Sequence, residues 1–110
     1  MASKTAQLAA AAMSANYTTP DDDAIDFGAF RTVGVQRRAL KTQAGNANLV
    51  VLRHRATKES AWVDTTVGFK LDGSDSDFQE LPSFLRYIGV KAPGSADGSA
   101  VFAFDLIAKE

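Results

Sequence analysis

The clearest alternation of apolar and polar positions in the chain runs from Trp62 to Leu71. A period of two residues is typical of a β-strand that buries one face. We therefore expect a half-buried strand over residues 62–71. One predicted face carries Val63, Thr65, Val67, Phe69 and Leu71, and the other carries Trp62, Asp64, Thr66 and Lys70.

Two earlier segments, 31–41 and 49–55, are rich in residues that favour strands and alternate in part. A turn signal at Gln43–Asn46 separates them, and another at Lys58–Ser60 precedes the strand at 62–71. Short connections join antiparallel strands, whereas parallel strands need long crossovers. The three segments are therefore predicted to form an antiparallel meander, with 31–41 and 49–55 as its first hairpin.

Helical spacing follows this meander. Ser76 with Gln79 matches a capping box, and Pro82 suits the start of a helix better than its interior. We expect one helical turn at 76–80 and a packed helix at 82–89. After a loop, the segment 101–107 is apolar enough for a strand that is buried on both faces. The apolar residues at helical spacing are Phe78, Leu81, Leu85 and Ile88.

The N-terminal segment is rich in alanine, which favours a helix that Ser3 can cap and that ends near Asn16. One isolated helix of this length is marginal in water, so the segment is either a docked arm or a mobile tail. We predict an arm at residues 1–19 and a single domain at 20–110. The expected fold class is α+β, with an antiparallel sheet of four to five strands, one packed helix and the helical arm.

The composition fits one ordinary domain. The chain has 110 residues, of which 45% are hydrophobic and 23% charged. Its net charge of −1 argues against a protein that coats nucleic acid or membranes by bulk charge. Without cysteine it has no disulfide, thiolate metal site or thiol nucleophile. The apolar run at 8–13 is too short for a membrane span and weak for a signal peptide, so we expect a cytoplasmic protein with no membrane partner.

Candidate catalytic residues are lacking in the sequence. The single histidine, His54, lies between two arginines, which disfavour its protonated form and give it no orienting partner. The glycines stand singly in turns, without the spacing of a phosphate-binding loop. The run Asp21–Asp23 lacks the alternate spacing of a calcium loop. We therefore expect no enzyme, no metal, no cofactor and no small-molecule substrate.

Charge is segregated along the chain. Residues 31–58 contain seven basic side chains and no acidic one, and acidic clusters flank them at 21–26 and 72–80. The predicted hairpin could bind nucleic-acid phosphates, face an acidic neighbouring subunit, or simply keep an edge strand soluble. The candidate contact residues are Arg31, Arg37, Arg38, Lys41, Arg53, Arg55 and Lys58.

The stretch Leu49–Leu71, LVVLRHRATKESAWVDTTVGFKL, resembles the central hairpin of small coat proteins of single-stranded RNA bacteriophages. The resemblance implies that basic and polar side chains face the genome from a dimeric sheet. Those coats end in two helices that clasp the partner, whereas this chain is expected to end in a strand, so no site residue is carried over. A β-rich domain with a small-residue arm and no active site is also similar to many virion coat and decoration proteins.

Two hypotheses follow from the sequence. The first is a self-assembling structural protein, a phage coat or decoration subunit made in the host cytoplasm and then part of the virion. It would use Leu8, Met13 and Trp62 as interface residues and the segment 31–58 against nucleic acid or a neighbouring subunit. The second is a small cytosolic nucleic-acid-binding protein that acts as a monomer or dimer.

Overall fold

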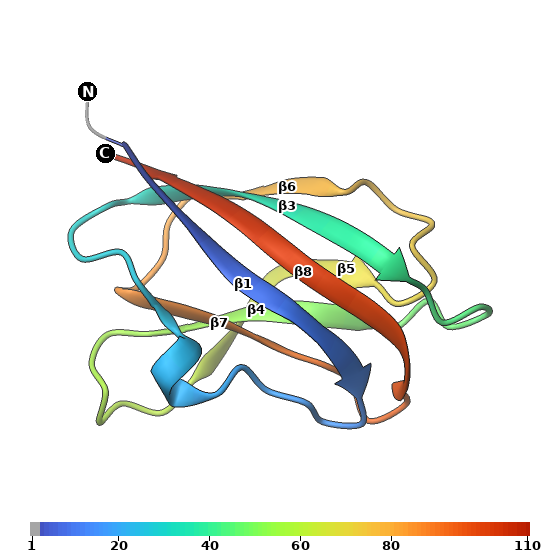
Figure 1. Cartoon of the computed structure of the whole chain (residues 1–110). Helices are drawn as coiled ribbons and strands as arrows, with labels where there is room; N and C mark the ends of the chain where they lie inside the picture. Colours follow the sequence, from blue (N-terminus) through green and yellow to red (C-terminus); the bar gives the residue numbers. More distant parts are fainter. Residues whose placement is uncertain (1–2) are drawn as a thin grey trace.

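Two four-stranded antiparallel sheets pack face to face in the computed structural model, which describes residues 3–110 (Figure 1). The first sheet has the order β1-β8-β3-β6, and the second has the order β2-β7-β4-β5. The first sheet comprises β1 (Ser3–Ser14), β8 (Asp97–Lys109), β3 (Thr32–Lys41) and β6 (Phe78–Leu81). The second comprises β2 (Ile25–Asp26), β7 (Tyr87–Lys91), β4 (Leu49–Arg55) and β5 (Val63–Lys70).

The core lies between the two sheets and follows the two-residue period of their strands. The inward positions of β8 and β3 are Phe102, Phe104, Leu106, Val33 and Val35, and those of β4 and β7 are Val50, Leu52, Ile88 and Val90. The rings of Phe69 and Phe104 join the layers, with their centroids 5.6 Å apart. Burial of these side chains is the main force that holds the two sheets together.

The predicted helical arm is wrong, because residues 3–14 form β1 and pair with β8. Leu8 and Met13 are 5% and 1% exposed, so strand β1 buries side chains that a lone helix would leave in water. Their separation is odd, and a regular strand would point them to opposite faces. The register steps from Leu8 opposite Phe104 to Ala11 opposite Phe102, and this extra residue turns both side chains inward.

The predicted helices at 76–80 and 82–89 are also wrong. The chain forms β6 and β7 there, so the fold is all-β rather than α+β. The Ser76 hydroxyl accepts a hydrogen bond from the Phe78 N–H at 3.2 Å, which makes a turn where a capping box was expected. Within residues 3–110 the helical structure is one 3-10 turn, η1 (Asp21–Asp23), and no helix has the length and apolar character to cross a membrane.

The four predicted strands exist, but their pairing differs from the predicted meander. β4 and β5 form the expected antiparallel hairpin, whereas β3 pairs with β8 and β6 in the other sheet. The connection 42–48 therefore crosses between the layers, and the basic segment 31–58 is not one hairpin. The expected burial of 101–107 on both faces is only partial, because the outward-facing Ile107 is 37% exposed.

Candidate functional site

The seven basic residues singled out from the sequence are distributed over both sheets. Arg31, Arg37, Arg38 and Lys41 belong to β3 or directly precede it, Arg53 and Arg55 belong to β4, and Lys58 follows β4 in the loop to β5. Each group has a different environment, so they do not act as one basic patch.

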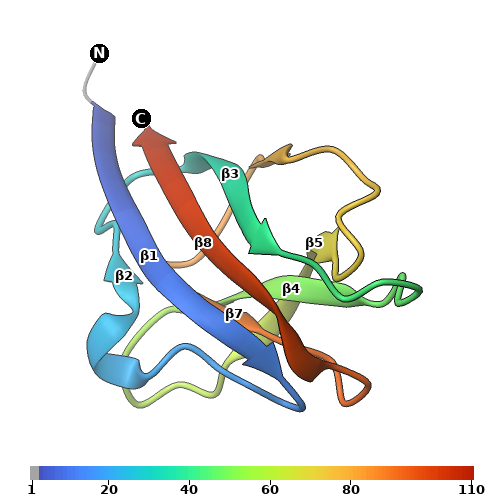
Figure 2. The same cartoon turned by 45° about the vertical axis from the view of Figure 1, so that its right-hand side comes forward.

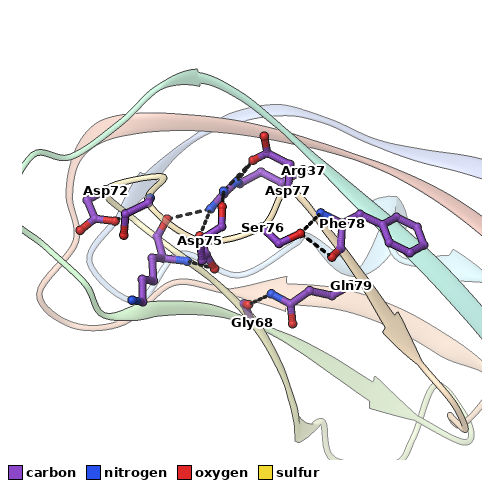
Figure 3. Close-up of polar contacts among 10 residues, drawn as sticks. Arg37, Gly68, Asp72, Asp75, Ser76, Asp77, Phe78 and Gln79 are labelled. Atoms are coloured by element: carbon purple, nitrogen blue, oxygen red, sulfur yellow. Dashed lines mark hydrogen bonds and ion pairs between the residues drawn. The ribbon is translucent and has the colours of Figure 1, made fainter.

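Arg37 points into the space between the sheets and is 1% exposed. Its Nε donates to Asp77 Oδ1 at 2.9 Å, and its Nη2 donates to the same oxygen at 2.6 Å (Figure 3). Its Nη1 donates to Asp75 Oδ1 and to the Lys70 carbonyl, both at 2.9 Å. Its Nη2 also donates to the Asp75 carbonyl at 3.3 Å. All five donors of the guanidinium are thereby used.

Two rings and a loop complete this arrangement, which we call the Arg37 cluster (Arg37, Asp75, Asp77, Phe69 and Phe102). The guanidinium carbon lies 5.3 Å and 5.2 Å from the centroids of Phe69 and Phe102. The Arg37 N–H also donates to the Asp77 carbonyl at 2.7 Å. The cluster therefore anchors the connection between β5 and β6, and Arg37 is not accessible to nucleic acid or to another subunit.

The alternation of β3 contains a signal for this placement. Val33, Val35 and Arg37 share one parity, so the strand that buries the two valines also turns Arg37 inward. Arg38 has the opposite parity and lies on the outer face, where its Nε donates to Asp105 Oδ2 at 2.8 Å. A basic side chain in register with buried valines requires a carboxylate partner, and the acidic cluster at 72–80 supplies two.

A second arginine group lies around Trp62, and we call it the Trp62 cluster (Arg53, Arg55, Trp62, Tyr87 and Asp21). The Arg55 guanidinium carbon lies 4.4 Å from the centroid of Trp62 and 5.9 Å from that of Tyr87. The guanidinium carbon of Arg53 lies 5.0 Å from the centroid of Trp62. Cation–π contact of this kind holds the two arginines and the indole together at the end of β4.

Polar contacts in the Trp62 cluster are few and long. Arg55 Nη2 lies 3.5 Å from Asp21 Oδ1, and Trp62 Nε1 donates to the same oxygen at 3.5 Å. The Nε atoms of Arg53 and Arg55 are buried and have no hydrogen-bond partner among residues 3–110. Burial also lowers the pKa of the Arg53 guanidinium. This cluster thus contains partly desolvated cations, each with one buried donor atom that has no partner among the described residues.

The other predicted site residues have simpler surroundings. Arg31, Lys41 and Lys58 are exposed. Leu8 and Met13, which were expected at an interface, lie in the core of this chain. The neighbouring His54 accepts a hydrogen bond from the Leu85 N–H at its Nδ1, at 3.0 Å, and burial lowers its pKa.

The outer edge of β1 is a surface that the sequence analysis did not identify. β1 lies at one margin of the first sheet beside β8, and in residues 3–110 no strand pairs with its other side (Figure 2). From residue 5 to residue 14 it carries no charged side chain. The absence of charge over residues 5–14 was the available signal in the sequence. A helical arm exposed to solvent would be expected to carry charged residues on its outer face.

The other three sheet edges are short or covered. β2 has two residues and β6 has four. β5 has eight residues, but it carries Asp64 and Lys70, and the side chain of Gln79 donates a hydrogen bond to its Gly68 carbonyl. Short edges, charges and covering side chains are the usual protection against pairing with another chain. β1, with 12 residues, has a single charge, Lys4, at its start and two irregularities in its register with β8, one after Leu8 and one after Ala12.

A hollow of about 290 Å³ adjoins the central part of β1. Residues 7–11 of β1 line one side of it, and Tyr17, Thr19 and Asp23 line the other. Phe102 and Phe104 form part of its wall. An unpaired strand next to a partly apolar hollow is the geometry that accepts an added strand, whose backbone pairs while alternate side chains enter the hollow.

In comparisons with protein-family models, with curated proteins and with solved structures, the chain matched none of them. The resemblance of Leu49–Leu71 to phage coat hairpins therefore stays a prediction.

Proposed function

We propose that this chain is a non-enzymatic structural subunit that self-associates through the edge of β1. The observation that carries the proposal is the contrast between this edge, 12 residues long and uncharged after Lys4, and the three short or covered edges. Natural proteins protect long edges when they must remain monomeric. An unprotected one supports a function that uses it.

The partner in this proposal is a second copy of the chain, with the two β1 strands antiparallel about a two-fold axis. Such an interface needs only one strand, because the same surface serves both subunits. The single charge of β1, Lys4, lies at one end. Antiparallel pairing keeps the two Lys4 side chains at opposite ends, whereas parallel in-register pairing would bring them together. The β1-β8-β3-β6 sheets of the two subunits would then form one continuous sheet across the dimer.

In its specific form the proposal is a virion coat or decoration subunit, since a shell is built by repeating one small domain through such contacts. Light scattering coupled to size-exclusion chromatography, over a range of concentrations, tests self-association. We expect a dimer or a larger particle, and the 260/280 nm absorbance ratio of each peak reports any nucleic acid carried with it. A monomer at every concentration would refute the proposal.

Charged variants test whether the β1 edge is responsible. Ala9→Lys and Ala12→Lys each place a lysine at an exposed position of β1, while Ala44→Lys changes an exposed alanine in a turn outside the sheets. We expect the β1 variants to weaken association at least about tenfold, which corresponds to about 1.4 kcal/mol. Ala44→Lys should associate like the unmodified protein. Equal effects of all three would indicate that net charge, not the edge, controls association.

Single cysteines test the antiparallel register, and the absence of native cysteine makes the background clean. Residues near a two-fold axis face their own copy across an antiparallel pair, at a Cα separation of about 4.5–5.5 Å, which a disulfide can span. Cysteines placed in turn at positions 7, 9, 10 and 12 should cross-link most at one position. Association without any such cross-link would leave the self-association standing and refute the two-fold pairing of β1.

A further inference from the structure

The Trp62 cluster is independent of the β1 edge and carries an inference of its own. Its central cation, Arg55, is 6% exposed, and the buried Nε atoms of Arg53 and Arg55 donate no hydrogen bond within residues 3–110. A buried guanidinium is normally compensated by acceptors on most of its donors. These two arginines stand two residues apart on β4 and share one indole ring, so their charges also repel each other.

The carboxylates near these arginines do not meet this need. Asp21 reaches Arg55 only at 3.5 Å, and its side chain is 71% exposed on the single turn η1. Asp64 lies opposite Arg53 in the β4–β5 register, but it forms no ion pair with Arg53 among the described residues. Burial therefore lowers the pKa of Arg53, and the charge of Asp64 offsets only part of that effect. Asp21 is therefore a weakly bound carboxylate of the same chain, and an anionic ligand that binds the arginines more tightly can replace it.

We propose that the face formed by Arg53, Arg55 and Trp62 binds a phosphate group, and that Asp21 moves aside when it binds. A phosphate monoester brings between one and two negative charges and several acceptor oxygens, which suit two guanidinium groups better than one distant carboxylate does. The indole holds both arginines in place, so little side-chain freedom is lost on binding.

The single tryptophan of the chain makes fluorescence a report from this site alone. We would titrate the protein with inorganic phosphate and, separately, with a deoxythymidine decamer, and record Trp62 emission. A saturable change with either probe is expected. Saturation by phosphate alone would identify small phosphate compounds as the source of the ligand. Tighter binding of the decamer, weakened by salt, would identify a polynucleotide backbone.

A gain of affinity in one variant is the sharpest test. Asp21→Asn removes the competing carboxylate and should tighten phosphate binding by about two- to fivefold, the range expected for the loss of one exposed ion pair. Asp22→Asn removes the same charge from the same turn, at a position that forms no ion pair with the cluster in residues 3–110, and should change affinity less. Loss of fold cannot imitate a gain of affinity, so this pair is informative even if arginine variants are unstable.

An arginine variant supplies the opposite effect. Arg53→Gln should weaken binding at least about fivefold, in line with the loss of a charge-assisted hydrogen bond, while circular dichroism confirms the fold. The proposal is overturned if neither probe gives a saturable change in Trp62 emission. It is also overturned if Asp21→Asn and Asp22→Asn act equally, because the effect would then come from overall charge. Both readouts are independent of whether the chain self-associates.

Discussion

Arg37 and Arg55 are both buried, and each guanidinium lies against two aromatic rings, yet their polar surroundings are opposite. Arg37 makes five hydrogen bonds through its side chain and contacts two carboxylates at 2.9 Å and 2.6 Å. Arg55 makes one ion pair at 3.5 Å and leaves its Nε without a partner among residues 3–110. The aromatic contacts alone therefore do not distinguish the two arginines, whereas their hydrogen bonds do.

The difference follows from where the acids lie. Asp75 and Asp77 are held by the connection that Arg37 anchors, so loop and cation fix each other. Asp21 belongs to an exposed turn that leads into β2 and is not held by the arginines in the same way. A cation that is enclosed by its own loop stabilises the fold. One that is only partly matched retains capacity for a ligand.

The largest effect is expected at Arg37. Replacing it by methionine keeps much of the buried volume but removes the guanidinium that Asp75 and Asp77 contact, together with one of the hydrogen bonds to the Lys70 carbonyl. This change should lower the free energy of unfolding by about 3–5 kcal/mol. Arg38→Met, on the exposed neighbour, is the matched control and should cost less than about 1 kcal/mol. Urea unfolding measures both. Similar losses for the two variants would contradict the anchoring role of Arg37.

A smaller loss is expected at Arg55. Its replacement by methionine removes a long ion pair and the cation–π contact with Trp62, which should lower the free energy of unfolding by about 1–2 kcal/mol. The same urea experiment, run beside Arg37→Met, checks the ranking. If Arg55→Met were as damaging as Arg37→Met, the contrast between an enclosed and a partly matched arginine would fail.

The smallest effect concerns Arg86, an exposed arginine that also lies against an aromatic ring. Its Nε and Nη2 donate to the two carboxylate oxygens of Asp26 at 2.8 Å and 2.9 Å, and its guanidinium carbon lies 5.2 Å from the centroid of Tyr87. The hydrogen bond from Arg86 is the main cause that lowers the pKa of Asp26 from 3.8 to about 2.

The direction of the pH effect follows from this lowered pKa. The contribution of the Asp26–Arg86 pair is present at pH values above 3.8 and is lost as the pH falls toward about 2. Urea unfolding at a series of acidic pH values should show a slightly steeper loss of stability for the unmodified protein than for Asp26→Asn. Identical pH profiles for the two proteins would show that this exposed pair contributes nothing measurable.

Strand positions could be predicted from the sequence where alternation was regular, as in residues 62–71, and where a turn signal separated two apolar segments, as between β4 and β5. Prediction failed where the local sequence favoured a helix but the chain forms a strand, as in β1, β6 and β7. The alanines of β1 favour a helix by less than about 1 kcal/mol per residue, and burial of Leu8 and Met13 outweighs that preference. The bulge that turns both of these side chains toward the core has no local signature in the sequence.

The candidate sites also differ in how far the sequence could have predicted them. Arg37 was expected at a contact surface, although it shares its parity with Val33 and Val35 and so could have been placed in the core. The cluster around Trp62, in contrast, depends on distant partners. Asp21 and Tyr87 lie 41 and 25 positions from Trp62, and only the packing of β7 and η1 against β4 brings them together. The run of seven basic residues misled for a related reason, since the assignment of β3 and β4 to one hairpin ignored the crossover between the sheets.

The pairing of β1 with β8 also has a consequence for how the chain folds. Ser3 pairs with Lys109, so the start of β1 lies beside the end of β8, as Figure 1 shows. β8 is the central partner of both β1 and β3, and a ribosome synthesises it after both of them. The first sheet therefore cannot be completed before β8 has been synthesised, whereas the local β4–β5 hairpin can form earlier. Contacts of such long sequence separation slow folding, and they leave the uncharged β1 segment exposed to other nascent chains until β8 arrives.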